Sequence, residues 1–221
     1  MDDEQAQREQ LILERILTLK HNLSEGRAGP VELHELGIMY FLLDNFEPSL
    51  EYLSRLLDEY PDYIELASAT SLRVFCHIKL DEFDVAERIV KERIQVYKTD
   101  TRLHAMLAHI QEKTERPRDA IQTHRRILEI DPDNLNSLNN LGYLLTLHGN
   151  PAEQNEALVH LKKALHKKPN HPAYLDSFGV HLARAGHTEN ARRALLKALQ
   201  FAPQNTEIMD HLKGLFQQGE N

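Results

Sequence analysis

Prolines recur at a nearly constant interval along this chain, and this interval constrains the fold more than any other feature. Pro61, Pro132, Pro169 and Pro203 each follow a stretch rich in leucine, isoleucine and alanine. They are separated by 71, 37 and 34 residues, and the first gap divides into 37 and 34 at Lys98. The period is therefore 34 residues, with three extra residues in two of the repeats. Periods of this size are typical of repeat architectures, in which each unit packs against its neighbours.

Small residues keep the same phase as the prolines. An apolar residue followed by glycine precedes the next proline by 24 to 27 residues at Gly37, Gly142 and Gly179, and Ala108 fills that position in the third repeat. A second small position holds Ser49, Ala86, Ala120, Ala157 and Ala191, and a third position holds Leu56, Arg93, Ile127, Ala164 and Ala198. Leucines at 158, 161 and 165 follow the three-and-four spacing of one helix face.

This set of markers resembles the tetratricopeptide repeat (TPR) family over roughly residues 30–205. The resemblance implies an all-α fold, a right-handed superhelical solenoid of about five TPR helix pairs with N- and C-terminal capping helices. In this family the small residues let the paired helices approach closely, and the proline closes the second helix. Residues 64–99 depart from the pattern, because they lack both the leucine–glycine pair and the final proline. The family's first-helix tyrosine is present only in the first repeat, as Tyr40.

The repeats and their flanks predict three regions. Residues 1–29 form an N-terminal helix, residues 30–205 form the TPR array, and residues 206–221 form a C-terminal capping helix and tail. The array divides into repeats at residues 30–63, 64–99, 100–133, 134–170 and 171–205. Apolar stripes mark both flanking helices, at Ile12, Ile16, Leu19 and Leu23, and at Ile208, Leu212 and Leu215. We expect these stripes to cover the ends of the stack. The N-terminal helix could instead pair with a second copy of the chain and form a homodimer.

The connections between helices carry turn and capping signals. Gly149 and Asn150 predict a helix stop followed by an N-cap, with Pro151 as the first residue of the next helix. The three extra residues of that repeat are then expected to lengthen this helix by nearly one turn. In "HKKPNHPAYLDSFG" (166–179), residues 166–168 end a helix, residues 169–171 form a turn, and Pro172 begins the next helix.

Composition excludes several functional classes. The net charge is -8, and acidic residues outnumber basic ones by 21 to 11 in residues 1–100 but by only 13 to 15 in residues 101–221. This balance argues against nucleic-acid binding. The single cysteine, Cys76, is expected to be a buried core residue. No apolar run is long enough for membrane insertion. The acidic start favours a cytoplasmic protein, or a periplasmic or exported one if a signal segment has been removed.

The sequence contains no recognisable catalytic or metal-binding motif. Its thirteen histidines never lie three or four residues apart, so no two of them share a helix face at ligand spacing. Phosphate-binding and dinucleotide-binding glycine patterns are also missing. We therefore predict that the protein is not an enzyme and binds no metal or cofactor.

The candidate site follows from the TPR resemblance, which implies a groove lined by set positions of each first helix. Carried onto the later repeats, these positions include Met106 and Val180 together with nine candidate site residues. The candidates are Arg102 and His109, then Asn136, Asn139, Asn140 and Tyr143, then Asp176, Ser177 and Arg184. Asparagine is a mediocre helix former, so three in five residues suggest a use such as gripping the backbone of an extended peptide. The alternative is that Asn136 belongs to the helix start and the other two are solvated. A family clamp for C-terminal carboxylates is not expected, because His34 and Ile38 occupy its first-repeat positions.

These observations lead to one principal functional hypothesis, a non-catalytic scaffold or adaptor that binds a partner peptide or protein in the TPR groove. The alternative is a chaperone or accessory factor for secretion or assembly. An enzyme or a metal-binding protein is the third and least favoured hypothesis.

Overall fold

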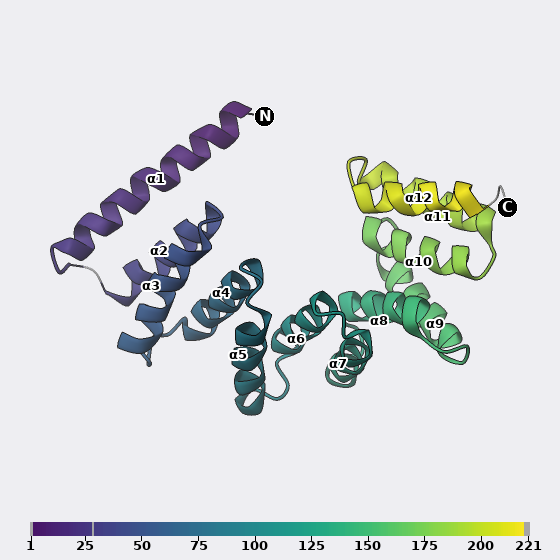
Figure 1. Ribbon diagram of the computed structural model, residues 1–221, viewed down its shortest axis with the longest axis horizontal. Helices are drawn as coiled ribbons and strands as arrows, with labels where there is room; N and C mark the ends of the chain where they lie inside the picture. The colour runs from purple at the N-terminus through teal and green to yellow at the C-terminus, as the bar shows by residue number, and fades with distance from the viewer. Residues whose placement is uncertain (1, 28, 219–221) are drawn as a thin grey trace. The chain divides into compact units, whose positions relative to one another are not determined.

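The computed structural model describes residues 2–27 and 29–218, and this part of the chain consists of twelve α-helices and the turns between them (Figure 1). The first five helices are α1 (Asp2–Ser24), α2 (Pro30–Leu42), α3 (Phe46–Glu59), α4 (Leu66–Lys79) and α5 (Phe83–Val96). The next seven are α6 (Thr101–Lys113), α7 (Pro117–Ile130), α8 (Leu135–His148), α9 (Glu153–Lys167), α10 (Pro172–Arg184), α11 (Thr188–Phe201) and α12 (Thr206–Gln218). The fold is the all-helical solenoid that the repeats predict.

The chain divides into two compact units, residues 1–92 and residues 93–221, and the division falls within α5. In the first unit α2 packs against α3, and α1 packs against α2. Ile12, Ile16 and Leu19 of α1 are buried in the same cluster as Leu36 and Leu53, so the predicted apolar stripe faces the neighbouring helices. Cys76 is buried in this cluster too, as predicted, and its thiol lies 3.3 Å from the Ser49 hydroxyl.

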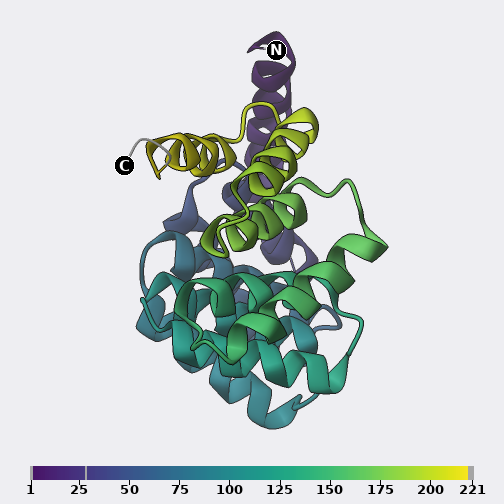
Figure 2. The ribbon, with the colours of Figure 1, turned by 90° about the vertical axis from the view of Figure 1, so that its right-hand side faces the viewer.

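In the second unit α6 pairs with α7, α8 with α9 and α10 with α11. Figures 1 and 2 show α12 lying alongside α10 and α11, and α12 packs against both. Ile208 and Leu215 of α12 are buried with Leu175 and Leu195. The C-terminal stripe predicted from the sequence therefore covers the last helix pair.

The helices form successive pairs, and a glycine in the first helix of three of these pairs (α2, α8 and α10) permits a close approach to the second helix. A Cβ atom at Gly142 would lie 2.6 Å from Leu161 Cγ, and one at Gly179 would lie 2.8 Å from Leu195 Cγ. In the first unit, the same atom at Gly37 would lie 2.7 Å from Leu53. The second small position is also fully buried at Ser49, Ala86, Ala120, Ala157 and Ala191. The repeat register read from the sequence thus matches the helix contacts.

Most first helices end in the same turn. The second residue beyond the helix lies in the left-handed region at Asp44, Asp81, Glu115 and Gly186, with φ between 55° and 79°. The amide of the next residue donates back to a carbonyl five residues earlier, as in Asn45 N to Tyr40 O at 3.0 Å. This bond satisfies carbonyl groups that the helix end leaves open.

The turn after α8 differs, and it corrects one prediction. The backbone at Gly149 is extended (φ -71°, ψ 154°), and Pro151 lies in a turn, because α9 begins only at Glu153. The three extra residues of this repeat are divided equally. The first helix α8 has 14 residues, whereas α6 and α10 have 13, and α9 has 15, whereas α7 and α11 have 14. The third residue lengthens the connection between α8 and α9. The N-cap residue of α9 is Ala152 and not Asn150 as predicted, although Asn150 Oδ1 still accepts from the amides of Ala152 and Glu153 at 2.9 and 3.1 Å.

Candidate functional site

All nine residues predicted for the groove lie in the second unit, on or beside its first helices α6, α8 and α10. We call the side of the unit formed by these three helices the first-helix face. Two hollows lie on it, and both include residues of α8. The predicted residues divide between these hollows and the packing beneath them.

The first hollow, which we call the polar cleft, has a volume of about 270 Å³. Its walls are the exposed side of α6, the start of α8 and one residue of α7. The lining residues are Thr101, Arg102, Ala105, His109, Glu112, His124, Asn134, Asn136, Ser137 and Asn140. The cleft therefore brings together four of the predicted residues, which are Arg102, His109, Asn136 and Asn140.

Arg102 is held at the mouth of the cleft by the cap of its own helix. The Asp100 carboxylate accepts from the Arg102 backbone amide at 2.9 Å and from its guanidinium at 3.1 and 2.8 Å. The side-chain hydrogen bond from Arg102 lowers the pKa of the Asp100 carboxyl, and the reverse contact raises the pKa of Arg102. This guanidinium therefore already has a counter-ion.

Two asparagines of α8 present amide donors to the cleft. The Asn136 Oδ1 accepts from the Tyr174 hydroxyl at 2.7 Å, and the Asn140 Oδ1 accepts from Asn139 Nδ2 at 3.3 Å. Burial raises the pKa of Tyr174, so its hydroxyl stays a donor. Among the described residues, neither amide NH₂ group donates to another protein atom. Both groups are therefore open to a ligand.

His124 of α7 forms part of the cleft wall, although the repeat pattern did not predict it. Its side chain is 3% exposed, and its Nε2 lies 3.3 Å from Glu112 Oε1. Its other ring nitrogen, Nδ1, has no hydrogen-bond partner among the described residues. No sequence pattern predicts this, because His124 belongs to a second helix and reaches the cleft only through the packing of α7 against α6 and α8.

Three predicted residues lie beneath the surface instead of lining the cleft. Asn139 is only 5% exposed, and Ser177 is buried with its hydroxyl donating to Ala173 O at 2.9 Å. Asp176 is buried as well, and its carboxylate oxygens lie 2.9 and 3.1 Å from His211 Nδ1. This hydrogen bond raises the pKa of His211, and it fastens α12 to α10.

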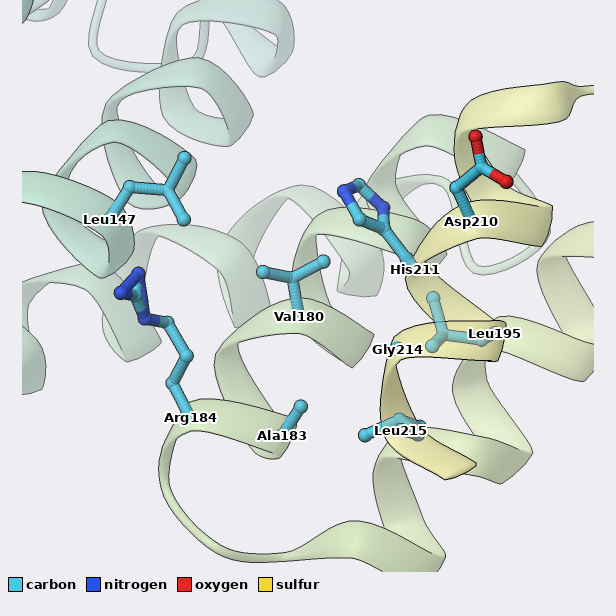
Figure 3. Close-up of a pocket in the computed structure, with 9 residues that line it drawn as sticks. All are labelled: Leu147, Val180, Ala183, Arg184, Leu195, Asp210, His211, Gly214 and Leu215. Carbon is cyan, nitrogen blue, oxygen red and sulfur yellow. The ribbon is translucent and has the colours of Figure 1, made fainter. Parts of the chain in front are cut away.

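The second hollow, which we call the apolar pocket, has a volume of about 300 Å³ and lies between α8, α10, α11 and α12 (Figure 3). Its lining residues are Leu147, Val180, Ala183, Arg184, Leu195, Asp210, His211, Gly214 and Leu215. Arg184 is the one candidate site residue in this lining, and Val180 also lies at a predicted groove position. The ninth predicted residue, Tyr143, is half-buried, with its ring centroid 6.4 Å from that of His211. The contribution of α12 was not foreseen, because its sequence marks it only as a cap.

Neither hollow has the features of a metal or membrane site. Among the described residues, no three histidine, cysteine, aspartate or glutamate side chains come together in a way that could hold a metal ion. Within residues 2–27 and 29–218, no helix has both the length and the apolar character needed to cross a bilayer.

Comparison with known proteins agrees with this architecture. The chain is 28% identical over 186 residues to the TPR repeat-containing protein PA4667 of Pseudomonas aeruginosa, a match that covers 83% of this chain and 30% of that protein. The chain thus spans about a third of the length of this curated relative.

Solved TPR structures share the fold at low sequence identity. One from Parabacteroides merdae superposes with a TM-score of 0.70 and 12% identity, over 85% of this chain and 72% of that one. YrrB, described as a TPR protein with an unusual peptide-binding site, superposes with a TM-score of 0.61 and 17% identity, over 88% of this chain and 97% of that one. TTC0263 of Thermus thermophilus superposes with a TM-score of 0.63 and 17% identity, over 85% of this chain and 99% of that one.

A family model described as the coatomer epsilon subunit matches residues 16–216, from within α1 to α12. Arrays of this kind offer extended surfaces for protein interaction. Since the model covers most of the sequence, the chain belongs to the coatomer epsilon subunit family, which is a family of TPR-like helical repeats.

Proposed function

We propose that this protein is a non-catalytic interaction scaffold that binds an extended segment of a partner protein along the first-helix face of its second unit. The observation that carries the proposal is the pair of open amide NH₂ groups on Asn136 and Asn140. Their carbonyl oxygens are already satisfied by donors from inside the protein. A ligand in the polar cleft is therefore met by two donors of fixed orientation.

The spacing of these donors suits an extended backbone. Residues four apart on a helix lie on the same face and are separated by about 6 Å along the axis, at a rise of about 1.5 Å per residue. In an extended chain, carbonyl groups that point the same way are two residues apart, which is about 6.7 Å. A partner segment running along α8 can therefore place one carbonyl at Asn136 and the next at Asn140.

The charges around the cleft favour a neutral acceptor over a free carboxylate. The Arg102 guanidinium is paired with Asp100, and a second carboxylate, Glu112, lies in the cleft wall. Backbone carbonyls accept hydrogen bonds without adding negative charge beside Glu112. This is the reason we assign the cleft to the main chain of a partner and not to a carboxylate group.

The relatives support the same class of function. YrrB is described by its peptide-binding site, and TPR homologues are typically non-catalytic scaffolds. The chaperone role remains a prediction of the sequence. The homodimer is also still a prediction. The exposed large apolar residues of α1 that it could use are Leu11, Leu13 and Leu17 (62%, 52% and 69%).

Exchanging the two asparagines for aspartates tests the proposal. Asn136→Asp and Asn140→Asp keep an acceptor oxygen for Tyr174 and Asn139, but they replace the donating NH₂ groups with acceptors. The matched control is Asn155→Asp with Asn190→Asp, which makes the same change of charge at exposed positions of α9 and α11.

Each double variant is used as an affinity bait, and the captured proteins are quantified by mass spectrometry against the wild type. We expect the α8 variant to lose its specific partners by at least about tenfold, which corresponds to about 1.4 kcal/mol, and the control to retain them. Equal capture by both variants, with unchanged helical content, would show that the amide pair does not bind the partner.

A further inference from the structure

The apolar pocket beneath α12 shares no lining residue with the polar cleft, and its walls are mainly apolar where those of the cleft are polar. Five of its lining residues, Leu147, Val180, Ala183, Leu195 and Leu215, are apolar (Figure 3). Its volume of about 300 Å³ lies at the lower end of the range for ligand pockets. The pocket therefore has room for one large side chain and not for a bulky cofactor.

One of the lining residues is a glycine. Gly214 lies within α12 and lines the pocket, and a Cβ atom added there would have no neighbouring heavy atom within 4 Å. The glycines of α8 and α10 behave in the opposite way, because a Cβ at Gly142 or Gly179 would collide with a leucine. Glycine weakens a helix interior, and the packing of α12 does not require it at this position. Gly214 therefore lines the pocket without placing a side chain in it.

One unpaired cation stands at the rim. Two other charged rim residues are already engaged, since His211 contacts Asp176 at 2.9 Å and Asp210 contacts Lys213 at 2.9 Å. Arg184 is exposed, and its guanidinium has no hydrogen bond or ion pair with any described residue. In Figure 3 its side chain extends from α10 toward Leu147 of α8. An anionic group of a ligand would find its counter-ion there.

We propose that the apolar pocket binds one large apolar side chain of the partner, such as phenylalanine, leucine or methionine, and that Arg184 binds the carboxylate of an adjacent acidic residue. This site deepens the proposed function and rests on it, because it names side chains that the bound segment must carry. Buried aromatic or aliphatic anchors next to an arginine contact are typical of residues that dominate binding energy. The main chain is held at the polar cleft, and the sequence preference is set at the apolar pocket.

Short peptides of defined sequence test this pocket directly. The probes are three acetylated and amidated peptides with Glu-Phe-Glu, Lys-Phe-Lys or Glu-Ala-Glu at the centre of a Gly/Ser sequence. Each is titrated into the full chain while the methyl NMR signals of Leu147, Val180 and Leu215 are recorded. We expect the Glu-Phe-Glu peptide to shift these signals saturably and to bind at least about tenfold more tightly than the other two.

Two substitutions separate the apolar contact from the charge. Gly214→Leu places a side chain in the empty space and should abolish the shifts, whereas Gln200→Leu, at an exposed position of α11, should not. Arg184→Glu should reverse the preference, so that the Lys-Phe-Lys peptide binds more tightly than Glu-Phe-Glu. Arg193→Glu is the matched control on α11 and should leave the preference unchanged.

The proposal is overturned if the methyl signals do not respond to Glu-Phe-Glu, or if Arg184→Glu leaves the charge preference as in the wild type. Failure here is distinct from failure of the proposed function. Unmoved methyl signals, with partner capture still dependent on Asn136 and Asn140, would remove the anchor pocket alone. Methyl shifts with partner capture that does not depend on these asparagines would remove the polar cleft alone.

Discussion

Replacing Gly142 with alanine should destabilise the second unit, although alanine is the better helix former. The new Cβ atom would lie 2.6 Å from Leu161 Cγ, 2.9 Å from Leu161 Cδ2 and 3.1 Å from Ala157 O. Favourable carbon–carbon contacts lie at about 3.5–4.0 Å, so α8 and α9 must separate by roughly 1 Å or Leu161 must leave its rotamer. Such overpacking costs about 1–3 kcal/mol.

The gain in helix propensity partly offsets this cost, and a second glycine measures the gain separately. Alanine is more favourable than glycine in a helix interior by about 0.8–1.0 kcal/mol. Gly214→Ala on α12 should show this gain alone, because its Cβ meets no atom within 4 Å. The change in free energy of unfolding for Gly214→Ala is subtracted from that for Gly142→Ala. The difference is the cost of crowding between α8 and α9, for which we expect about 1–3 kcal/mol.

Urea unfolding of the full chain, followed by far-ultraviolet circular dichroism, supplies both values. A double-mutant cycle with Leu161→Ala then tests the cause, because removing the leucine side chain should relieve most of the penalty at Gly142. If Gly142→Ala stabilises the protein as much as Gly214→Ala, α8 and α9 do not approach in the manner described. The repeat register would then be wrong.

Three further predictions concern single titrating or reactive groups. The Glu153 carboxyl should titrate by NMR at a pKa of about 2, because the Asn150 amide hydrogen bond and two arginines lower it. Its contribution to stability is complete above the usual pKa of 4.5 and is lost as the pH falls from there through about 2. The pKa of His211 should lie above 6.5 and should fall in the Asp176→Asn variant. Because folding raises this pKa, the stabilising contribution of the pair is complete below pH 6.5 and is lost as the pH rises through the pKa of His211 in the folded protein. Cys76 should resist a thiol reagent in the folded protein and react on unfolding, because burial hides the thiol and raises its pKa; rapid labelling under native conditions would contradict its place in the core.

The helix pairing could be read from the sequence because it depends on local and periodic features. Gly142 and Gly179 recur in phase with Pro169 and Pro203, and each glycine does face a leucine of the paired helix. The left-handed turns at Asp81 and Glu115 have no glycine, so their common geometry appears only in the structure. The start of α9 was misjudged, because the length of a repeat does not say how extra residues divide between its two helices and the turn.

The candidate site was only partly predictable, because periodicity gives the face of a helix but not the depth of a side chain. Asn139 and Asn140 are neighbours in a helix, yet Asn139 is buried while Asn140 lines the polar cleft. Asp176 was expected to face a ligand, and α12 covers it instead through His211. That contact joins residues 35 apart in the sequence, and no local pattern encodes it.

Site-specific photo-crosslinking tests most directly whether partners bind the first-helix face. A benzophenone amino acid at Ala105 would stand in the polar cleft, whereas one at Val159 or Leu196 would stand at an exposed position of a second helix, α9 or α11. We predict covalent adducts with the captured partners from Ala105, and none from Val159 or Leu196. Adducts from Val159 or Leu196 with none from Ala105 would contradict the assignment of the binding site to the first-helix face.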